Sequence, residues 1–79
     1  MDRNAIFTKV KKYILDQLPI DAAKVTEDAR MIEDLGADSA NLMMLIMDLE
    51  EEFGMTVEDE ALGAIKTVGD IVDYIAKKG

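Results

Sequence analysis

Apolar residues recur at the spacing of an α-helix in three stretches of this chain, and no stretch alternates as a strand would. In the first stretch Ile6, Val10 and Ile14 lie four residues apart, which predicts a helix over residues 4–18. Pro19 should end this helix, because proline lacks an N–H and constrains the residue before it.

The second predicted helix begins at Asp38-Ser39 and ends at Phe53-Gly54, where glycine is a usual C-terminal stop. One side of it carries a complete apolar stripe, made of Leu42, Leu45, Ile46, Leu49 and Phe53. The last helix opens at Thr67-Val68-Gly69-Asp70, which resembles a capping box with Asp in the place of Glu or Gln. With a minor helix near 58–63, the pattern predicts an all-α fold: a small four-helix bundle of three long helices and one short one.

Residues 19–38 form a long connection between the first two long helices. Such a connection is either functional or packed by its own side chains. Five large apolar residues favour the packed alternative: Ile20, Val25, Met31, Ile32 and Leu35.

The residue types that are missing limit the chemistry available to the chain. A length of 79 residues suits a single domain, 1–79, without cysteine or histidine. Disulfides, thiol catalysis, Ser/His triads and histidine metal sites are therefore excluded. No glycine-centred window has the acid spacing of a calcium-binding EF-hand loop, which leaves only weak divalent binding by acidic clusters. An enzyme is the least expected class, and we predict no metal site.

Acidic residues are concentrated in the middle of the chain. Between Glu27 and Glu60 there are 12 acids and one base, Arg30, a net charge of −11, whereas the flanks carry 5 acids and 8 bases, or +3. This field repels nucleic acid and anionic membranes and attracts basic partners, although it can also be a solvated face. No window approaches a membrane span, and the N-terminus lacks the apolar run of a signal peptide. We expect a cytoplasmic monomer without stable membrane insertion.

Ser39 is the first candidate site residue. It stands at the start of a helix, where several backbone N–H groups are unpaired and an anion is tolerated. Asp38 can cap the helix, which leaves the Ser39 hydroxyl without a structural role and predicts that it is modified. The alternative is that Ser39 only contributes to capping, as serines near helix starts often do.

A methionine-rich strip lies largely opposite the core stripe of the second helix. We define the methionine strip as Met43, Met44 and Met47; Ala40 shares its sector, and Glu50 and Glu51 flank it. Methionine can fill gaps if a small bundle buries a second side of this helix. Alternatively, the strip is an exposed, adaptable surface that binds a partner.

Two blocks of sequence resemble the acyl carrier proteins. They are Asp34-Leu35-Gly36-Ala37-Asp38-Ser39 and Leu49-Glu50-Glu51-Glu52-Phe53, and the likeness continues through Thr67–Asp70 to Tyr74-Ile75. The resemblance covers essentially the whole chain. It implies that Ser39 carries 4′-phosphopantetheine, attached from coenzyme A by a phosphopantetheinyl transferase whose metal ion Asp38 assists.

The same resemblance implies a function and a set of partners. The thiol of the arm would hold acyl groups as thioesters and present them to fatty-acid-type biosynthetic enzymes. The bundle interior would shelter the acyl chain, and the second helix would dock onto basic patches of acyl-transferring and synthase enzymes. The expected docking residues are Ala40, Met43, Met44, Met47, Glu50 and Glu51.

Three residues depart from the family pattern beside the expected site. Ala40 replaces the usual leucine, and Asn41 and Met44 stand where fatty-acid carriers often have acids. A specialised carrier for polyketide, aminoacyl or dedicated lipid chemistry is therefore an alternative. An unmodified acidic interaction bundle is the alternative from a different class.

Overall fold

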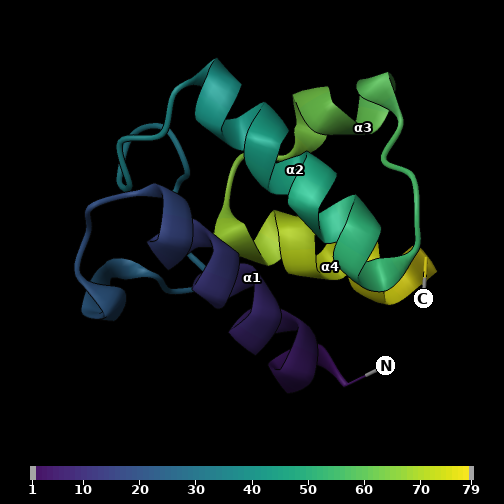
Figure 1. The fold of residues 1–79 in the computed structure, drawn as a ribbon, viewed down its shortest axis with the longest axis horizontal. Helices are drawn as coiled ribbons and strands as arrows, with labels where there is room; N and C mark the ends of the chain where they lie inside the picture. Colours follow the sequence, from purple (N-terminus) through teal and green to yellow (C-terminus); the bar gives the residue numbers. More distant parts are fainter. Residues whose placement is uncertain (1, 79) are drawn as a thin grey trace.

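A computed structural model of the chain describes residues 2–78, which form four α-helices and one 3₁₀ helix (Figure 1). The elements are α1 (Arg3–Gln17), η1 (Ala22–Lys24), α2 (Ser39–Phe53), α3 (Asp59–Ala64) and α4 (Val68–Lys78). Helix α1 packs against both α2 and α4. The predicted all-α bundle is confirmed, and the predicted helix boundaries differ from the observed ones by at most one residue.

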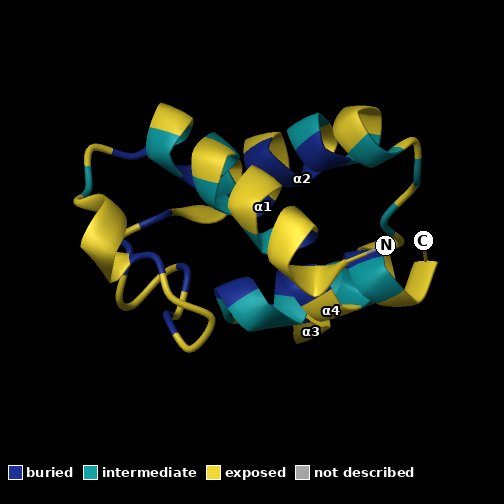
Figure 2. Cartoon of the chain, turned by 90° about the horizontal axis from the view of Figure 1, so that it is seen from below, coloured by how far each residue is buried: buried dark blue, intermediate teal, exposed yellow. Residues whose placement is uncertain are grey.

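The core is built from the inward faces of the three long helices. Dark blue segments in Figure 2 face the space between α1, α2 and α4, and yellow segments face outward. Leu42 and Phe53, at the ends of the predicted stripe on α2, are only partly buried. The buried helical residues are Ile6, Val10, Ile14, Leu45, Ile46, Leu49, Val68, Ile71, Val72 and Ile75.

The predicted helix ends are formed by identifiable groups. Leu18, before Pro19, is extended and closes α1. Gly54 ends α2 with φ +62°, a left-handed conformation that glycine adopts without a Cβ clash. At α4, Thr67 N–H donates to the Asp70 carboxylate and Asp70 N–H donates to Thr67 Oγ1, both over 3.1 Å. The predicted reciprocal cap is therefore present.

The connection 19–38 packs mainly as expected, with one exception. Val25, Met31 and Leu35 are buried, whereas Ile32 is 56% exposed, so its predicted packing is wrong. Met31 N–H donates to Lys66 O over 2.9 Å, and Val68 N–H donates to Ala29 O over 3.0 Å. These bonds fix Met31 on the inward side of a turn, so Ile32, the next residue, faces outward. The helix η1 inside this connection was not predicted.

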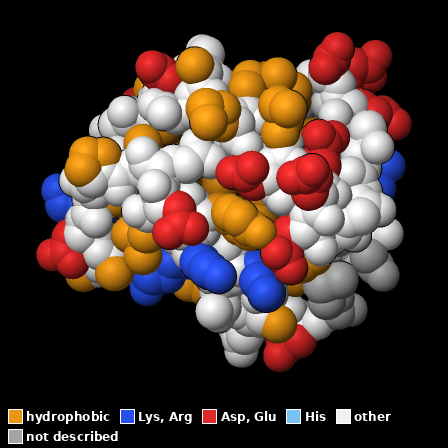
Figure 3. Space-filling model, in the orientation of Figure 1, with side chains coloured by type: hydrophobic (Ala, Val, Ile, Leu, Met, Phe, Trp, Pro, Cys, Tyr) orange, Lys and Arg blue, Asp and Glu red, His pale blue; other side chains and the backbone are white. Residues whose placement is uncertain are grey.

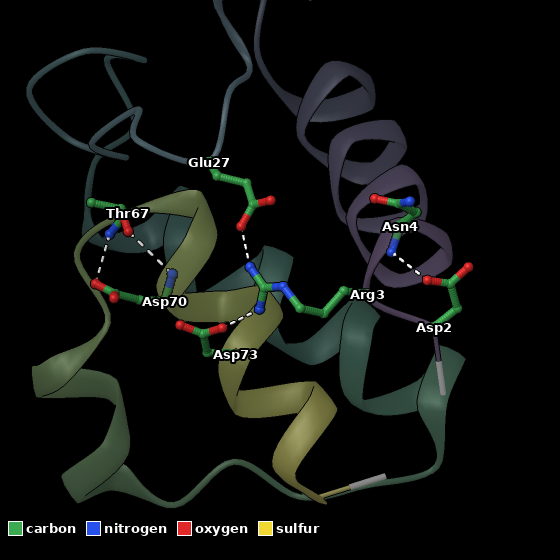
Figure 4. A network of polar contacts seen from close by, with 7 residues as sticks. All are labelled: Asp2, Arg3, Asn4, Glu27, Thr67, Asp70 and Asp73. Atoms are coloured by element: carbon green, nitrogen blue, oxygen red, sulfur yellow. Dashed lines mark hydrogen bonds and ion pairs between the residues drawn. The ribbon is translucent and has the colours of Figure 1, made fainter.

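Arg3 joins three parts of the fold (Figure 4). Its guanidinium contacts Glu27 in the connection and Asp73 on α4. Gly69 N–H donates to Glu27 O over 2.9 Å, and a Cβ added at Gly69 would lie 3.0 Å from the same oxygen. The start of α4 therefore approaches the connection closely, and the ion pairs of Arg3 join the start of α1 to the connection and to α4.

Candidate functional site

Ser39 is the first residue of α2, is exposed, and is the only serine in the chain. The preceding Asp38 caps the helix: its Oδ1 accepts from Asn41 N–H over 2.7 Å. In return, Asn41 Oδ1 accepts from Asp38 N–H over 3.2 Å. This capping box is complete without the Ser39 hydroxyl, which leaves that hydroxyl free for a reaction.

The reciprocal role of Asn41 was not predicted. Its place three residues after the cap was the available signal, because a capping box uses that position. The usual residue there is Glu or Gln, and asparagine is one methylene shorter. Asn41 therefore has a structural role in the site, at a position where fatty-acid carriers often have an acid.

A hydrogen-bonded turn from Arg30 to Asp34 precedes Asp38. Arg30 N–H and Nε donate to Asp34 Oδ2 over 2.8 and 3.1 Å, and Nη2 donates to Oδ1 over 3.1 Å. These bonds lower the pKa of Asp34 and raise that of Arg30. Gly36 follows with φ +73°, and Ala37 N–H donates to Met31 O over 3.0 Å. The segment before Ser39 is therefore held by its own bonds.

A groove begins about one helical turn from Ser39, at Leu42. It has a volume of about 350 Å³, and Leu42, three residues after Ser39, lines it. The other lining residues come from the turn, from α3 and from the segment after α3: Arg30, Met31, Ile32, Glu33, Leu62, Gly63, Ile65 and Lys66. A mainly apolar groove one turn from an exposed hydroxyl suits an elongated group attached to that oxygen.

The methionine strip lies on an exposed side of α2. Met43, Met44 and Met47 are 48%, 58% and 60% exposed, so the interpretation of this side as a second buried face is wrong. Ala40 and Glu51 are also exposed. Figure 3 shows hydrophobic side chains gathered over the first half of α2 and acidic side chains over its second half. The strip is thus an exposed apolar surface next to an acidic one.

Three acids of α2 have partners within the fold, and the first, Asp48, accepts from Gln17 Nε2 over 3.0 Å. Glu50 is half-buried, and its carboxylate accepts from Val57 N–H over 2.7 Å, which ties α2 to the segment before α3. Glu52 accepts from Tyr13 Oη over 2.6 Å and lies 3.5 Å from Lys9 Nζ. These bonds lower the pKa of Glu52, and its carboxylate raises the pKa of Tyr13 to about 12. Glu51 is the flanking acid most available to a partner.

The bundle interior is closed in this structure. The gap between α2 and α4, lined by residues such as Ile46 and Ile71, has a volume of only about 10 Å³. That is no more than a single water occupies. An acyl chain that enters there must displace side chains, whereas the groove beside Leu42 is already open.

Residues 2–78 contain neither a candidate metal site nor a membrane-spanning helix. No cluster of three or more acidic side chains has the arrangement of a metal site. None of the helices there combines the length and the apolar character that crossing a membrane requires.

The site residues fit a phosphate-linked arm on Ser39. The hydroxyl is exposed, it lies at the end of α2 where backbone N–H groups favour an anion, and the groove begins one turn away. Of the predicted residues, Asp38, Ser39, Ala40, Met43 and Met44 lie at the cap and in the first six residues of α2, and Met47 lies about one turn further along. Glu50 is directed to the α3 side.

Comparisons with known proteins agree with this arrangement. The family pattern described as "Phosphopantetheine attachment site" matches residues 8–75. The chain is 55% identical to an acyl carrier protein of Thermotoga maritima over 76 residues, 96% of this chain and 94% of that protein.

Two solved structures are similar over nearly all of their length. The acyl carrier protein of Enterococcus faecalis has a TM-score of 0.84 at 39% identity, with 100% of each chain covered. A Mycobacterium tuberculosis protein assigned as an acyl carrier protein has a TM-score of 0.86 at 31% identity, covering 94% of this chain and 99% of that one.

Proposed function

The chain belongs to the acyl carrier proteins, and from this premise we propose that Ser39 is the residue that bears its 4′-phosphopantetheine. Proteins of this family are carriers and not enzymes: they hold acyl chains on phosphopantetheine and interact with transferases and synthases. The observation that carries the assignment to Ser39 is its free, exposed hydroxyl next to a cap formed by Asp38 and Asn41 alone.

The neighbours of Ser39 support complementary roles. When bound, phosphopantetheine supplies a thiol that forms thioesters with acyl groups. The N-terminal N–H groups of α2 favour the phosphate on the Ser39 oxygen, and the groove lined by Leu42 and Leu62 accommodates the apolar part of the arm or its cargo. Asp38 is proposed to assist the transferase's metal ion, since its second carboxylate oxygen is not needed for the bond to Asn41.

Mass spectrometry of the loaded chain tests the attachment site. Incubation of the apo chain with a broad-specificity phosphopantetheinyl transferase and coenzyme A should add the mass of one arm. Ser39→Ala should abolish the gain, whereas Thr56→Ala, which removes another exposed hydroxyl, should leave it unchanged. A gain of mass in Ser39→Ala, or none in the native chain, contradicts the assignment.

The partner surface is proposed to be the exposed side of α2 next to Ser39. Its apolar part is the methionine strip with Ala40, and its acidic part is Glu51, with Glu50 contributing while it holds Val57. The complementary enzyme surface has an apolar centre facing the strip and basic residues facing the acids. Apolar contact gives affinity, and charge gives fast, salt-sensitive encounter.

We propose that this single acyl carrier domain serves fatty-acid-type synthesis in the cytoplasm. The pathway can be tested by measuring which ketosynthases accept the acyl-loaded chain. Rapid turnover by a fatty-acid ketosynthase supports the proposal. Turnover only by polyketide or other dedicated enzymes would instead assign the carrier to a specialised pathway, consistent with Met44 and Asn41 at positions where acids are common.

A further inference from the structure

Methionines are the only sulfur-containing side chains of this protein, which has six methionines and no cysteine. Their environments differ sharply. Met43, Met44 and Met47 are 48–60% exposed, whereas Met31 is 2% exposed and Met55 is partly buried. Among these five, the thioethers most open to a dissolved oxidant are therefore the three of the methionine strip.

The strip lies close to the proposed attachment site. Met43 follows Ser39 by four residues and Met47 follows Met43 by four, and residues at this spacing are neighbours on one helix face. We therefore expect an enzyme whose active site reaches the Ser39 oxygen to contact Met43 as well. A change of polarity at the strip would act directly where enzyme and carrier touch.

The oxidation itself is simple chemistry. A thioether sulfur attacks one oxygen of a peroxide, the S–O bond forms, and the O–O bond breaks. The sulfur loses two electrons and becomes a sulfoxide, while the other peroxide oxygen leaves as water or an alcohol after taking up the proton. Sulfoxide reductases reverse the step, consuming a dithiol and releasing a disulfide and water.

We propose that Met43, Met44 and Met47 are a reversible oxidation site through which peroxide controls the access of partner enzymes to Ser39. The inference rests on the proposed function of Ser39 and of the strip. Sulfoxides replace an apolar contact surface by a polar one and so weaken docking. The three side chains lie outside the core, so the fold and the capping box are retained.

The test uses the apo chain of 79 residues, which has no pantetheine thiol to react with peroxide. The chain is treated with hydrogen peroxide, freed of oxidant, and mapped by peptide mass, each sulfoxide adding about 16 Da. Oxidation of the strip should precede that of Met31. Loading by the transferase should then show a KM raised by roughly tenfold, equivalent to ~1.4 kcal/mol, with an unchanged thermal midpoint.

Two controls isolate the strip. A reductase should restore the native KM, and the triple variant Met43→Leu, Met44→Leu, Met47→Leu should keep its KM after the same peroxide treatment. Equal KM values for the native and the oxidised chain, or equal oxidation rates at Met31 and at the strip, would overturn the inference alone. Failure of the untreated native chain to load would instead overturn the proposed function, and the inference with it.

Discussion

Ser39 is available for modification because its two neighbours complete the helix cap. Asp38 has a structural role, its bond to Asn41 N–H, and a proposed chemical role in the loading reaction. Two substitutions separate these roles, because asparagine caps a helix about as well as aspartate but carries no charge.

We expect Asp38→Asn to retain native stability but to load phosphopantetheine more slowly. Asp38→Ala should lose ~1 kcal/mol of unfolding free energy and load slowly as well. Urea denaturation measures the stability, and intact mass over time measures loading by the transferase. Loading of Asp38→Asn at the native rate would remove the proposed assistance by the carboxylate.

Tyr13 provides a pH prediction at the level of one residue. Its hydrogen bond to the Glu52 carboxylate, with a smaller contribution from desolvation, raises its pKa from 10.0 to about 12. The stabilisation from this bond is therefore complete below pH ~10 and is lost as the pH rises through about 12. Tyrosinate absorbance, recorded in a Tyr74→Phe background, should titrate with the higher midpoint, and Glu52→Gln should lower it. A midpoint near pH 10 in Tyr74→Phe alone would show that the hydrogen bond from Tyr13 to Glu52 is absent in solution.

The cap of α4 gives a second pH prediction, at the level of a helix. Bonds from the backbone N–H groups of Lys66 and Thr67 lower the pKa of Asp70. Because folding lowers this pKa, the ionised Asp70 carboxylate stabilises the fold fully at pH values above its ordinary pKa of 3.8. This stabilisation is lost as the pH falls through the lowered pKa. Asp70→Ala should cost ~1 kcal/mol at neutral pH and less in acid. Unfolding free energies at both pH values check this, and a cost that does not change with pH contradicts it.

The docking side of α2 can be tested by a single added charge. Met44→Glu places an acid in the methionine strip, where we propose that an apolar partner surface lies, and should weaken binding of the partner by ~1 kcal/mol or more. Ala5→Glu adds the same charge on an exposed position of α1 and should change binding little. Calorimetric titration with a phosphopantetheinyl transferase or a ketosynthase measures both variants. Equal affinity of Met44→Glu and Ala5→Glu for the enzyme would exclude the methionine strip from the interface.

Helical elements were predictable from sequence, but the contacts between elements were not. Periodicity and end signals predicted the helices, and they predicted the placement of Ser39 after the Asp38 cap. The exposure of Ile32 depends on the bond from Met31 N–H to Lys66 O, 35 residues away in sequence. The bond from Glu50 to Val57 likewise depends on how the chain returns after Gly54. Local patterns do not encode either, because each needs two separately folded segments to meet.

At the scale of the whole molecule, the uneven charge distribution is partly balanced by the fold. Two bases of the N-terminal flank lie against acids of the central segment: Lys9 is close to Glu52, and Arg3 contacts Glu27. These pairs are exposed, so each contributes little on its own. The acids between residues 27 and 60 still far outnumber such partners, and the net charge of the chain remains −8.

Repulsion among these acids should make the stability of the protein depend on salt. Raising NaCl from about 0.01 to about 0.15 M shortens the Debye length from ~30 to ~8 Å, which is smaller than the 28 × 25 × 19 Å extents of the molecule. Long-range repulsion is then screened, and the thermal midpoint should rise by about 5 °C. Arg3→Met, which keeps an apolar stem but removes two ion pairs, should lower the midpoint most at low salt and less at high salt. Calorimetry at both salt concentrations measures each effect, and a native midpoint that falls with added salt would mean that attractive pairs outweigh the repulsion of the acidic segment.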